Sequence, residues 1–234
     1  MRTRIAVATL VATAALIAAA LAQGAAGGGV GTGFRAHVDN PWFPLEPGTV
    51  YEYRGVRDGR PTRDVMTVTR KTKLVDGAPC VVVSDLLYID GRLAERTSDW
   101  YTQDAKGNVW YFGEATAELD ESGKVTTTEG SWQSGRNGAR PGIFMPAHPR
   151  VGYAGRQEYY KGHAEDHFRV VSLRASVRVP YTLSKSALLT EEWTPLEPGV
   201  RDHKFYVRGI GTVLEQTVKG GDERNELVSV KRNG

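Results

Sequence analysis

The segment SDWYTQDAKGNVWYFGEATAEL (residues 98–119) combines aromatic side chains with carboxylates. Two strands joined by a turn at 106–108 would carry the ligand-binding candidates Trp100, Tyr101, Trp110 and Tyr111. Flat apolar walls with a few polar anchors suit a sugar or another small amphipathic molecule. Aromatic residues also pack between the strands of β-sheet cores, which explains the same pattern without a ligand. Both interpretations stay open on the sequence alone.

The carboxylates of this segment point to a second kind of chemistry. Asp99 and Glu114 flank the aromatic residues and would pair across the hairpin as an acid and a base, as glycoside hydrolysis requires. A catalytic site built on carboxylates would draw on five candidates: Asp99, Asp104, Glu114, Glu165 and Asp166.

The densest group of metal-capable residues lies in HAEDH, at 163–167. On a strand, His163, Glu165 and His167 would share one face and offer nitrogen and oxygen ligands to a divalent metal. A divalent metal is therefore the one cofactor that the sequence suggests. The alternative is a solvated hairpin tip, because YYKGHAED has the polar, glycine-containing composition of a turn.

Several enzyme classes lack their signatures in this chain. There is no nucleophile elbow, phosphate-binding loop, dinucleotide-binding fingerprint or zincin helix motif. The single cysteine, Cys80, lies in an apolar strand-like run without a flanking histidine or basic residue, so we expect a buried, inert thiol.

The N-terminus predicts a cleaved secretory signal peptide over residues 1–22. Arg2 and Arg4 precede an apolar run, and Ala20-Leu21-Ala22 provides an exit site of the A-x-A type. We therefore expect a secreted or periplasmic protein without a membrane span after cleavage. Cleavage would remove both arginines and lower the formal net charge from +3 to +1. No block of basic residues remains, which excludes a nucleic-acid partner. The chain gives no prediction of oligomeric state.

Residues 23–33 are rich in glycine and predict a flexible leader, and 34–234 predict a single domain. Strand patterns with period two dominate that domain, for example DVMTVTRKTKLV (64–75). Asp90-Gly91, between two such patterns, is a strong hairpin signal. No sustained helical pattern follows the signal peptide.

One long stretch, 129–154, contains three Pro and five Gly, which disfavour regular structure, together with large apolar side chains. These features predict an all-β fold: a single antiparallel barrel or strongly curved sheet, with the irregular segment 129–154 packed over one end.

A set of motifs resembles a family of secreted bacterial β-rich proteins and covers most of the predicted mature chain. The motifs are NPWFPLEPGTVYEYRG (40–55), DWYTQDAKGNVWYFGE (99–114), PGIFMPAHPRVG (141–152), QEYYKGHAED (157–166) and YVRGIGTVLEQ (206–216). The last element is similar to a C-terminal strand pair of periplasmic families, some with a curved sheet that carries lipids. The resemblance implies the fold, and it favours Glu165 and Asp166 over the two histidines as functional residues.

Three functions remain open at this stage. The first is a non-enzymatic binding protein that holds a small amphipathic, hydrophobic or lipid-like ligand in an aromatic-lined cavity. The second is a hydrolase or lyase that uses carboxylates, with or without a divalent metal. The third is a structural or interaction module of the cell envelope.

Overall fold

The computed structural model describes residues 33–232, and no helix occurs within that range. The predicted all-β fold class is therefore confirmed. The predicted signal peptide and all of the glycine-rich leader except Gly33 lie outside the described residues. Within 33–232, no helix is long and apolar enough to cross a membrane.

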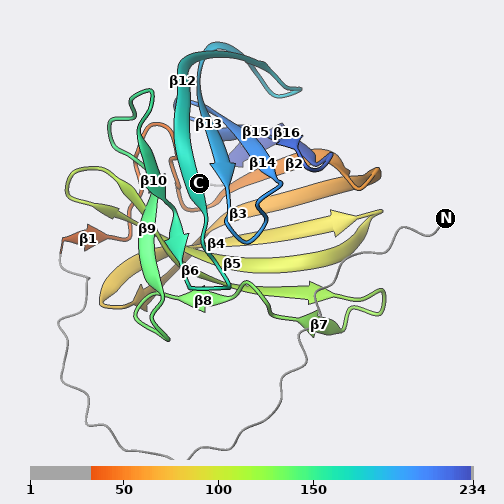
Figure 1. Ribbon diagram of the computed structural model, residues 1–234, viewed down its shortest axis with the longest axis horizontal. Helices are drawn as coiled ribbons and strands as arrows, with labels where there is room; N and C mark the ends of the chain where they lie inside the picture. Colours follow the sequence, from red (N-terminus) through yellow and green to blue (C-terminus); the bar gives the residue numbers. More distant parts are fainter. Residues whose placement is uncertain (1–32, 233–234) are drawn as a thin grey trace, which may run out of the picture.

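Within residues 33–232, sixteen strands make up one antiparallel sheet (Figure 1). In chain order they are β1 (Phe34–Arg35), β2 (Thr49–Arg57), β3 (Arg60–Val75), β4 (Ala78–Ile89), β5 (Arg92–Asp104), β6 (Val109–Leu119), β7 (Val125–Thr127), β8 (Trp132–Gln133), β9 (Arg140–Met145), β10 (Ala154–Arg156), β11 (Glu158–Tyr159), β12 (His167–Arg178), β13 (Leu183–Trp193), β14 (Arg201–Val207), β15 (Gly211–Lys219) and β16 (Arg224–Arg232).

The main path of the sheet runs β10-β12-β13-β14-β15-β16-β2-β3-β4-β5-β6-β9-β11. Most neighbours on this path are also neighbours in the chain, so the fold is built largely from hairpins. Asp90 and Gly91 both adopt positive φ (51° and 77°) between β4 and β5, as the predicted two-residue turn requires. The short strands β1, β7 and β8 lie off the path and pair with β5 or β6.

The two ends of the path meet at Gln157, which makes the sheet nearly closed. β10 and β11 are the two edge elements, and Gln157 is the single residue between them in the chain. The Gln157 backbone N–H donates to the Asp166 carbonyl at 2.8 Å. We call this junction of β9, β10, β11 and residue 157 the seam. Figure 1 shows β9 and β10 side by side in front of the curved sheet.

The segment 129–154, predicted to be irregular, is instead partly strand, because it contains β8, β9 and the first residue of β10. β9 pairs with β6 and with β11, so it builds the closing wall. Gly142 permits this closure, because a Cβ atom on it would lie 2.2 Å from the Arg156 carbonyl oxygen. Two of the glycines and prolines of this segment, Pro141 and Gly142, therefore lie in the strand β9, whose backbone closely approaches that of Arg156.

Two apolar clusters lie on opposite faces of the sheet. The larger fills the interior and includes Trp42, Phe43 and Leu45, which enter it from the segment before β2. The smaller lies on the outer face of β4, β5 and β6 and consists of Val75, Ala78, Cys80, Trp100 and Phe112, with Phe34 of β1 packed on it. Cys80 is buried there, and burial raises the pKa of its thiol to about 12. This placement agrees with an inert thiol.

Candidate functional site: the acidic interior

The interior of the sheet contains four neighbouring hollows that share lining residues. Their volumes are about 150, 140, 240 and 180 Å³. Because side chains alternate between the faces of a strand, β3 directs Asp64, Met66 and Val68 inward, and β14 directs Lys204 and Tyr206 inward. We call the following eight residues the inner carboxylates: Asp64, Asp85, Asp99, Glu114, Glu158, Asp166, Glu192 and Glu215.

Lys204 is the cation at the centre of this interior. Its Nζ lies 3.0 Å from a Glu192 oxygen and 3.2 Å from a Glu215 oxygen, and Glu215 is its register partner on β15. Glu192 also accepts hydrogen bonds from Thr190 (2.9 Å) and Tyr206 (3.2 Å). Burial acts to lower the pKa of Lys204, but the two carboxylates outweigh it and raise that pKa well above its usual value. Lys204 is therefore a fixed ammonium ion.

Asp99 and Glu114 face each other across β5 and β6, as the sequence predicted. A β-bulge makes this possible. One residue separates Asp99 from Tyr101 on β5, but two separate Tyr111 from Glu114 on β6. The extra residue lets both Tyr111 and Glu114 point inward, while Phe112 enters the outer cluster. Gly113 occupies the bulge with φ +132°.

The pair carries protons near neutral pH. Burial, reinforced by the charge of Asp85, raises the pKa of Asp99 to about 7, although Tyr111 donates a hydrogen bond to it at 2.7 Å. Burial and the charge of Asp99 raise the pKa of Glu114 to about 9. Two facing carboxyl groups with different pKa values near neutrality can act as a proton donor and a proton acceptor.

Asp64 and Asp85 form a second pair on β3 and β4. Burial raises the pKa of Asp64 to about 10, and a hydrogen bond and the negative charge of Asp85 act in the same direction. The Asp64 Oδ1 atom is buried and has no hydrogen-bond partner among the described residues. Such an atom is costly to leave unpaired, so a hydrogen-bonding group that reached it would stabilise the site.

Glu158 and Asp166 lie at the seam. Trp132 Nε1 donates to Glu158 at 2.6 Å. Burial and the charge of Asp166 raise the pKa of Glu158 to about 8, and burial also raises the pKa of Asp166. Gln157 lines the same hollow with 5% of its surface exposed, and its Nε2 atom has no partner within residues 33–232.

The four predicted ligand-binding aromatic residues divide between the two faces of the sheet. Tyr101 and Tyr111 lie inside, where their rings stack at 4.7 Å and border the hollows together with Phe144. Trp100 and Trp110 lie in or against the outer cluster, away from the inner carboxylates. This division follows from strand alternation, because each Trp precedes its Tyr by one residue.

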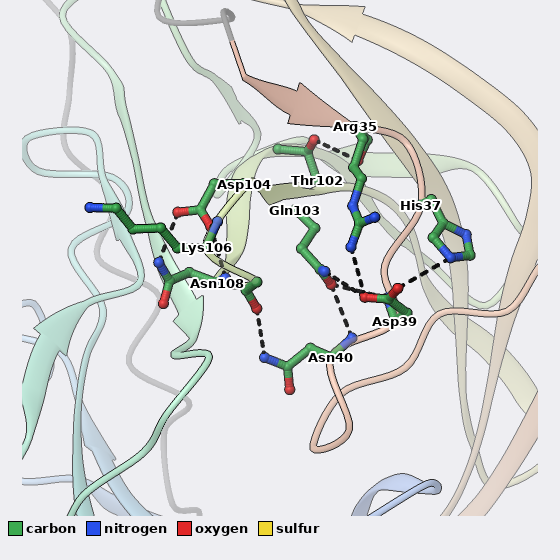
Figure 2. A network of polar contacts seen from close by, with 10 residues as sticks. Arg35, His37, Asp39, Asn40, Thr102, Gln103, Asp104, Lys106 and Asn108 are labelled. Atoms are coloured by element: carbon green, nitrogen blue, oxygen red, sulfur yellow. Dashed lines mark hydrogen bonds and ion pairs between the residues drawn. The ribbon is translucent and has the colours of Figure 1, made fainter.

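Asp104 holds a turn outside the hollows. Its carboxylate accepts hydrogen bonds from the backbone of Lys106 and Asn108, from the Asn108 amide and, at 2.9 Å, from Trp110 Nε1. Burial acts to raise the pKa of Asp104, but these hydrogen bonds outweigh it and lower that pKa. Figure 2 shows Asp104 next to Gln103, whose side chain binds Asp39 and the backbone of Asn40 and ties the N-terminal segment to β5.

His163, Glu165 and His167 each contact a different partner. His163 lies 2.7 Å from Glu129, Glu165 accepts from the Gly162 backbone at 2.8 Å, and His167 lies 2.8 Å from the Glu165 carbonyl oxygen. β12 begins only at His167, so the alternation that would align the three residues does not apply to 163–165. Among residues 33–232, no group of three or more His, Cys, Asp or Glu side chains is arranged to hold a metal ion.

Of the five candidate carboxylates, Asp99, Glu114 and Asp166 line the hollows, and Asp104 and Glu165 stabilise turns. Sequence reasoning missed five inner carboxylates and the central cation: Asp64, Asp85, Glu158, Glu192, Glu215 and Lys204. One available signal was alternation. Asp64-x-Met66-x-Val68 places a charge in phase with apolar residues that must face a core.

Comparisons with known proteins identify no family. No family model and no curated protein matches the chain. Two solved structures are similar in shape. A Bacteroides fragilis protein, described as exported and of YmcC-like fold, has a TM-score of 0.46 and 15% identity, and the match covers 82% of this chain and 99% of that one. A Parabacteroides distasonis protein, described as a lipoprotein, has a TM-score of 0.43 and 10% identity, with the same coverage. Neither likeness transfers an activity or a ligand to this chain.

Proposed function

We propose that this chain is a non-enzymatic binding protein that holds a small amphipathic molecule inside its nearly closed sheet. The observation that supports this proposal most directly is the row of hollows, because it combines the aromatic walls of Tyr101, Tyr111 and Phe144 with polar anchors. Hollows of 140–240 Å³ suit a ligand with about ten non-hydrogen atoms, comparable to cavities that bind a single aromatic ring.

Binding is tested with a library of small aromatic amphiphiles of varied charge, screened by saturation-transfer NMR. Met66 lines one hollow from β3, so Met66→Trp should fill it and abolish binding of the compounds found. Leu74→Trp is the matched control, because Leu74 lies on the same strand and is 70% exposed. A wild-type protein that binds no compound, or equal binding by Met66→Trp, would contradict the proposal.

A hydrolase is the second candidate, and the facing pair of Asp99 and Glu114 favours it. With pKa values of about 7 and 9, the pair would give a rate that peaks between those values. A panel of nitrophenyl glycosides and esters tests for such activity. Asp99→Asn should then reduce turnover by at least about 100-fold, in the range typical of a general acid or base. Equal rates for the wild type and the variant would exclude the pair as catalysts.

We place this function outside the cytoplasm, on the strength of the predicted signal peptide. The expected mature protein begins at Gln23. Intact mass and N-terminal sequencing of the protein exported by a bacterial host would test this. A chain that retains residues 1–22 in the cytoplasmic fraction would rule out both the cleavage and the location.

A further inference from the structure

The interior has an excess of acidic side chains that the chain as a whole does not share. The full chain carries a formal net charge of +3. In contrast, the four hollows are bordered by twelve Asp or Glu residues and only two basic residues, Arg57 and Lys204. The acidic residues of a nearly neutral protein are therefore concentrated where a ligand would lie.

The two basic residues are already paired. Lys204 is bound to Glu192 and Glu215, and Arg57 makes a two-point contact with Glu223 at 2.9 and 3.0 Å. Among the ion pairs of residues 33–232, none involves the other six inner carboxylates: Asp64, Asp85, Asp99, Glu114, Glu158 and Asp166. Without a counterion, burial keeps such carboxyl groups protonated, with pKa values of about 10 for Asp64 and about 9 for Glu114. A cationic ligand beside them would stabilise their ionised forms.

Two buried polar atoms without partners indicate which hydrogen-bonding groups a ligand would need. Asp64 Oδ1 is an acceptor without a donor, and an ammonium N–H would supply one. Gln157 Nε2 is a donor without an acceptor, and it borders the hollow of Glu114, Glu158 and Asp166. A hydroxyl or carbonyl oxygen on the ligand would satisfy it.

The side chains that line the hollows favour an organic cation over a metal ion as the ligand. Tyr101, Tyr111 and Phe144 border the same hollow as Glu158 and Asp166, and aromatic faces attract ammonium groups. A calcium ion needs six to eight oxygen ligands around one point, whereas no metal-holding cluster of three side chains exists within 33–232.

We propose that the interior binds a small protonated amine that also carries an oxygen acceptor, with the ammonium group among the inner carboxylates and the oxygen on Gln157. This inference rests on the proposed binding function and names its ligand class.

Three probes of nearly equal size test the two requirements by isothermal titration calorimetry at pH 7. Tyramine has both groups, 4-ethylphenol lacks the ammonium group, and phenethylamine lacks the oxygen. Tyramine should bind at least about tenfold more tightly than either analogue, since one good polar contact contributes about that factor. Equal affinity of tyramine and 4-ethylphenol would overturn the role of charge. Equal affinity of tyramine and phenethylamine would overturn the role of the oxygen acceptor.

Variants assign the contacts. Asp64→Asn and Glu114→Gln should weaken tyramine several-fold and leave 4-ethylphenol unchanged, and Gln157→Leu should weaken tyramine but not phenethylamine. With pKa values of about 10 and about 9, Asp64 and Glu114 are protonated at pH 7 in the empty interior, so their neutral amide replacements should fold. Glu121→Gln is the control, because that side chain is 85% exposed in a turn. Tyramine affinity unchanged in all three site variants would overturn the assignment.

The outcomes separate this inference from the proposed function. If uncharged library compounds bind and Met66→Trp blocks them while tyramine does not bind, the binding function stands and the amine inference fails. If neither the library nor the probes bind, the binding function itself fails.

Discussion

Lys204 offsets two of the inner carboxylates, so its removal tests the charge balance at the scale of one residue. Lys204→Met would leave Glu192 and Glu215 without a counterion in an interior that is largely shielded from solvent. We expect a loss of about 2–3 kcal/mol in the free energy of unfolding, below the roughly 3–5 kcal/mol of fully buried pairs, because the side chain is 21% exposed. Urea denaturation at pH 7 measures it. Adding Glu192→Gln should restore part of the loss, and an unchanged stability of Lys204→Met would refute this account.

Glu114 predicts how stability depends on pH. Its pKa is raised from 4.5 to about 9 by burial and by the charges of Asp99, Glu158, Glu95 and Asp166, which face it. Between those pH values the folded state binds more protons than the unfolded state. The stabilisation present below pH 4.5 is therefore lost as pH rises toward 9. Unfolding free energies at pH 5, 7 and 9 should fall steadily, and Glu114→Gln should flatten the decline. A rise between pH 5 and 9 would contradict the raised pKa.

The residues show which parts of the site could be predicted from the sequence. The proximity of Asp99 and Glu114 was accessible, because a turn at 106–108 joins their strands. Their direct pairing was not, since the register set by the turn would place Gly113 opposite Asp99 and only the bulge brings Glu114 there. Asp64 could have been found, because it lies in phase with Met66 and Val68. Lys204 could not, since its strand carries charged side chains on both faces and only the closed sheet determines which face is buried. The metal-binding role of His163 and His167 was uncertain for a different reason. Three polar residues in HAEDH fitted one face of a strand, but the neighbouring glycine and charges favoured a solvated turn.

At the scale of an element, the bulge at Gly113 is the local feature of β6 that lets both Tyr111 and Glu114 face the interior. A Cβ atom at this position would lie 2.4 Å from the Trp132 carbonyl oxygen, and φ is +132°. Gly113→Ala should therefore cost at least about 2 kcal/mol of unfolding free energy, from backbone strain and the clash together. Gly123→Ala is the matched control, because it has φ +80° and open space around the added atom, and should cost about 1 kcal/mol. Equal losses by urea denaturation would show that the contact with β8 is unimportant.

The strands and turns also differ in how well the sequence pattern could predict them. The Asp90-Gly91 hairpin was predictable because the turn type demands those residues. The strand β9 was not, since Pro141 and Gly142 lower strand propensity and only its two neighbours, β6 and β11, stabilise it. The bulge at Gly113 leaves no clear trace either, because a glycine within an aromatic strand pattern fits several local geometries.

At the scale of the whole molecule, the seam determines whether the interior is a site at all. Closure runs through β10, Gln157 and β11, because β10 pairs with β12 and β11 pairs with β9. The sequence could not reveal it, since strands of three and two residues carry too little pattern to be recognised. Gly142→Ala would place a Cβ atom 2.2 Å from the Arg156 carbonyl oxygen without any positive φ, so it tests closure alone. We expect the seam to open, with faster amide exchange in β9, β10 and β11 and loss of tyramine binding. Gly199→Ala has open space around its Cβ atom and should change neither. Retained binding and unchanged exchange in Gly142→Ala would show that the inner carboxylates form their site without a closed sheet.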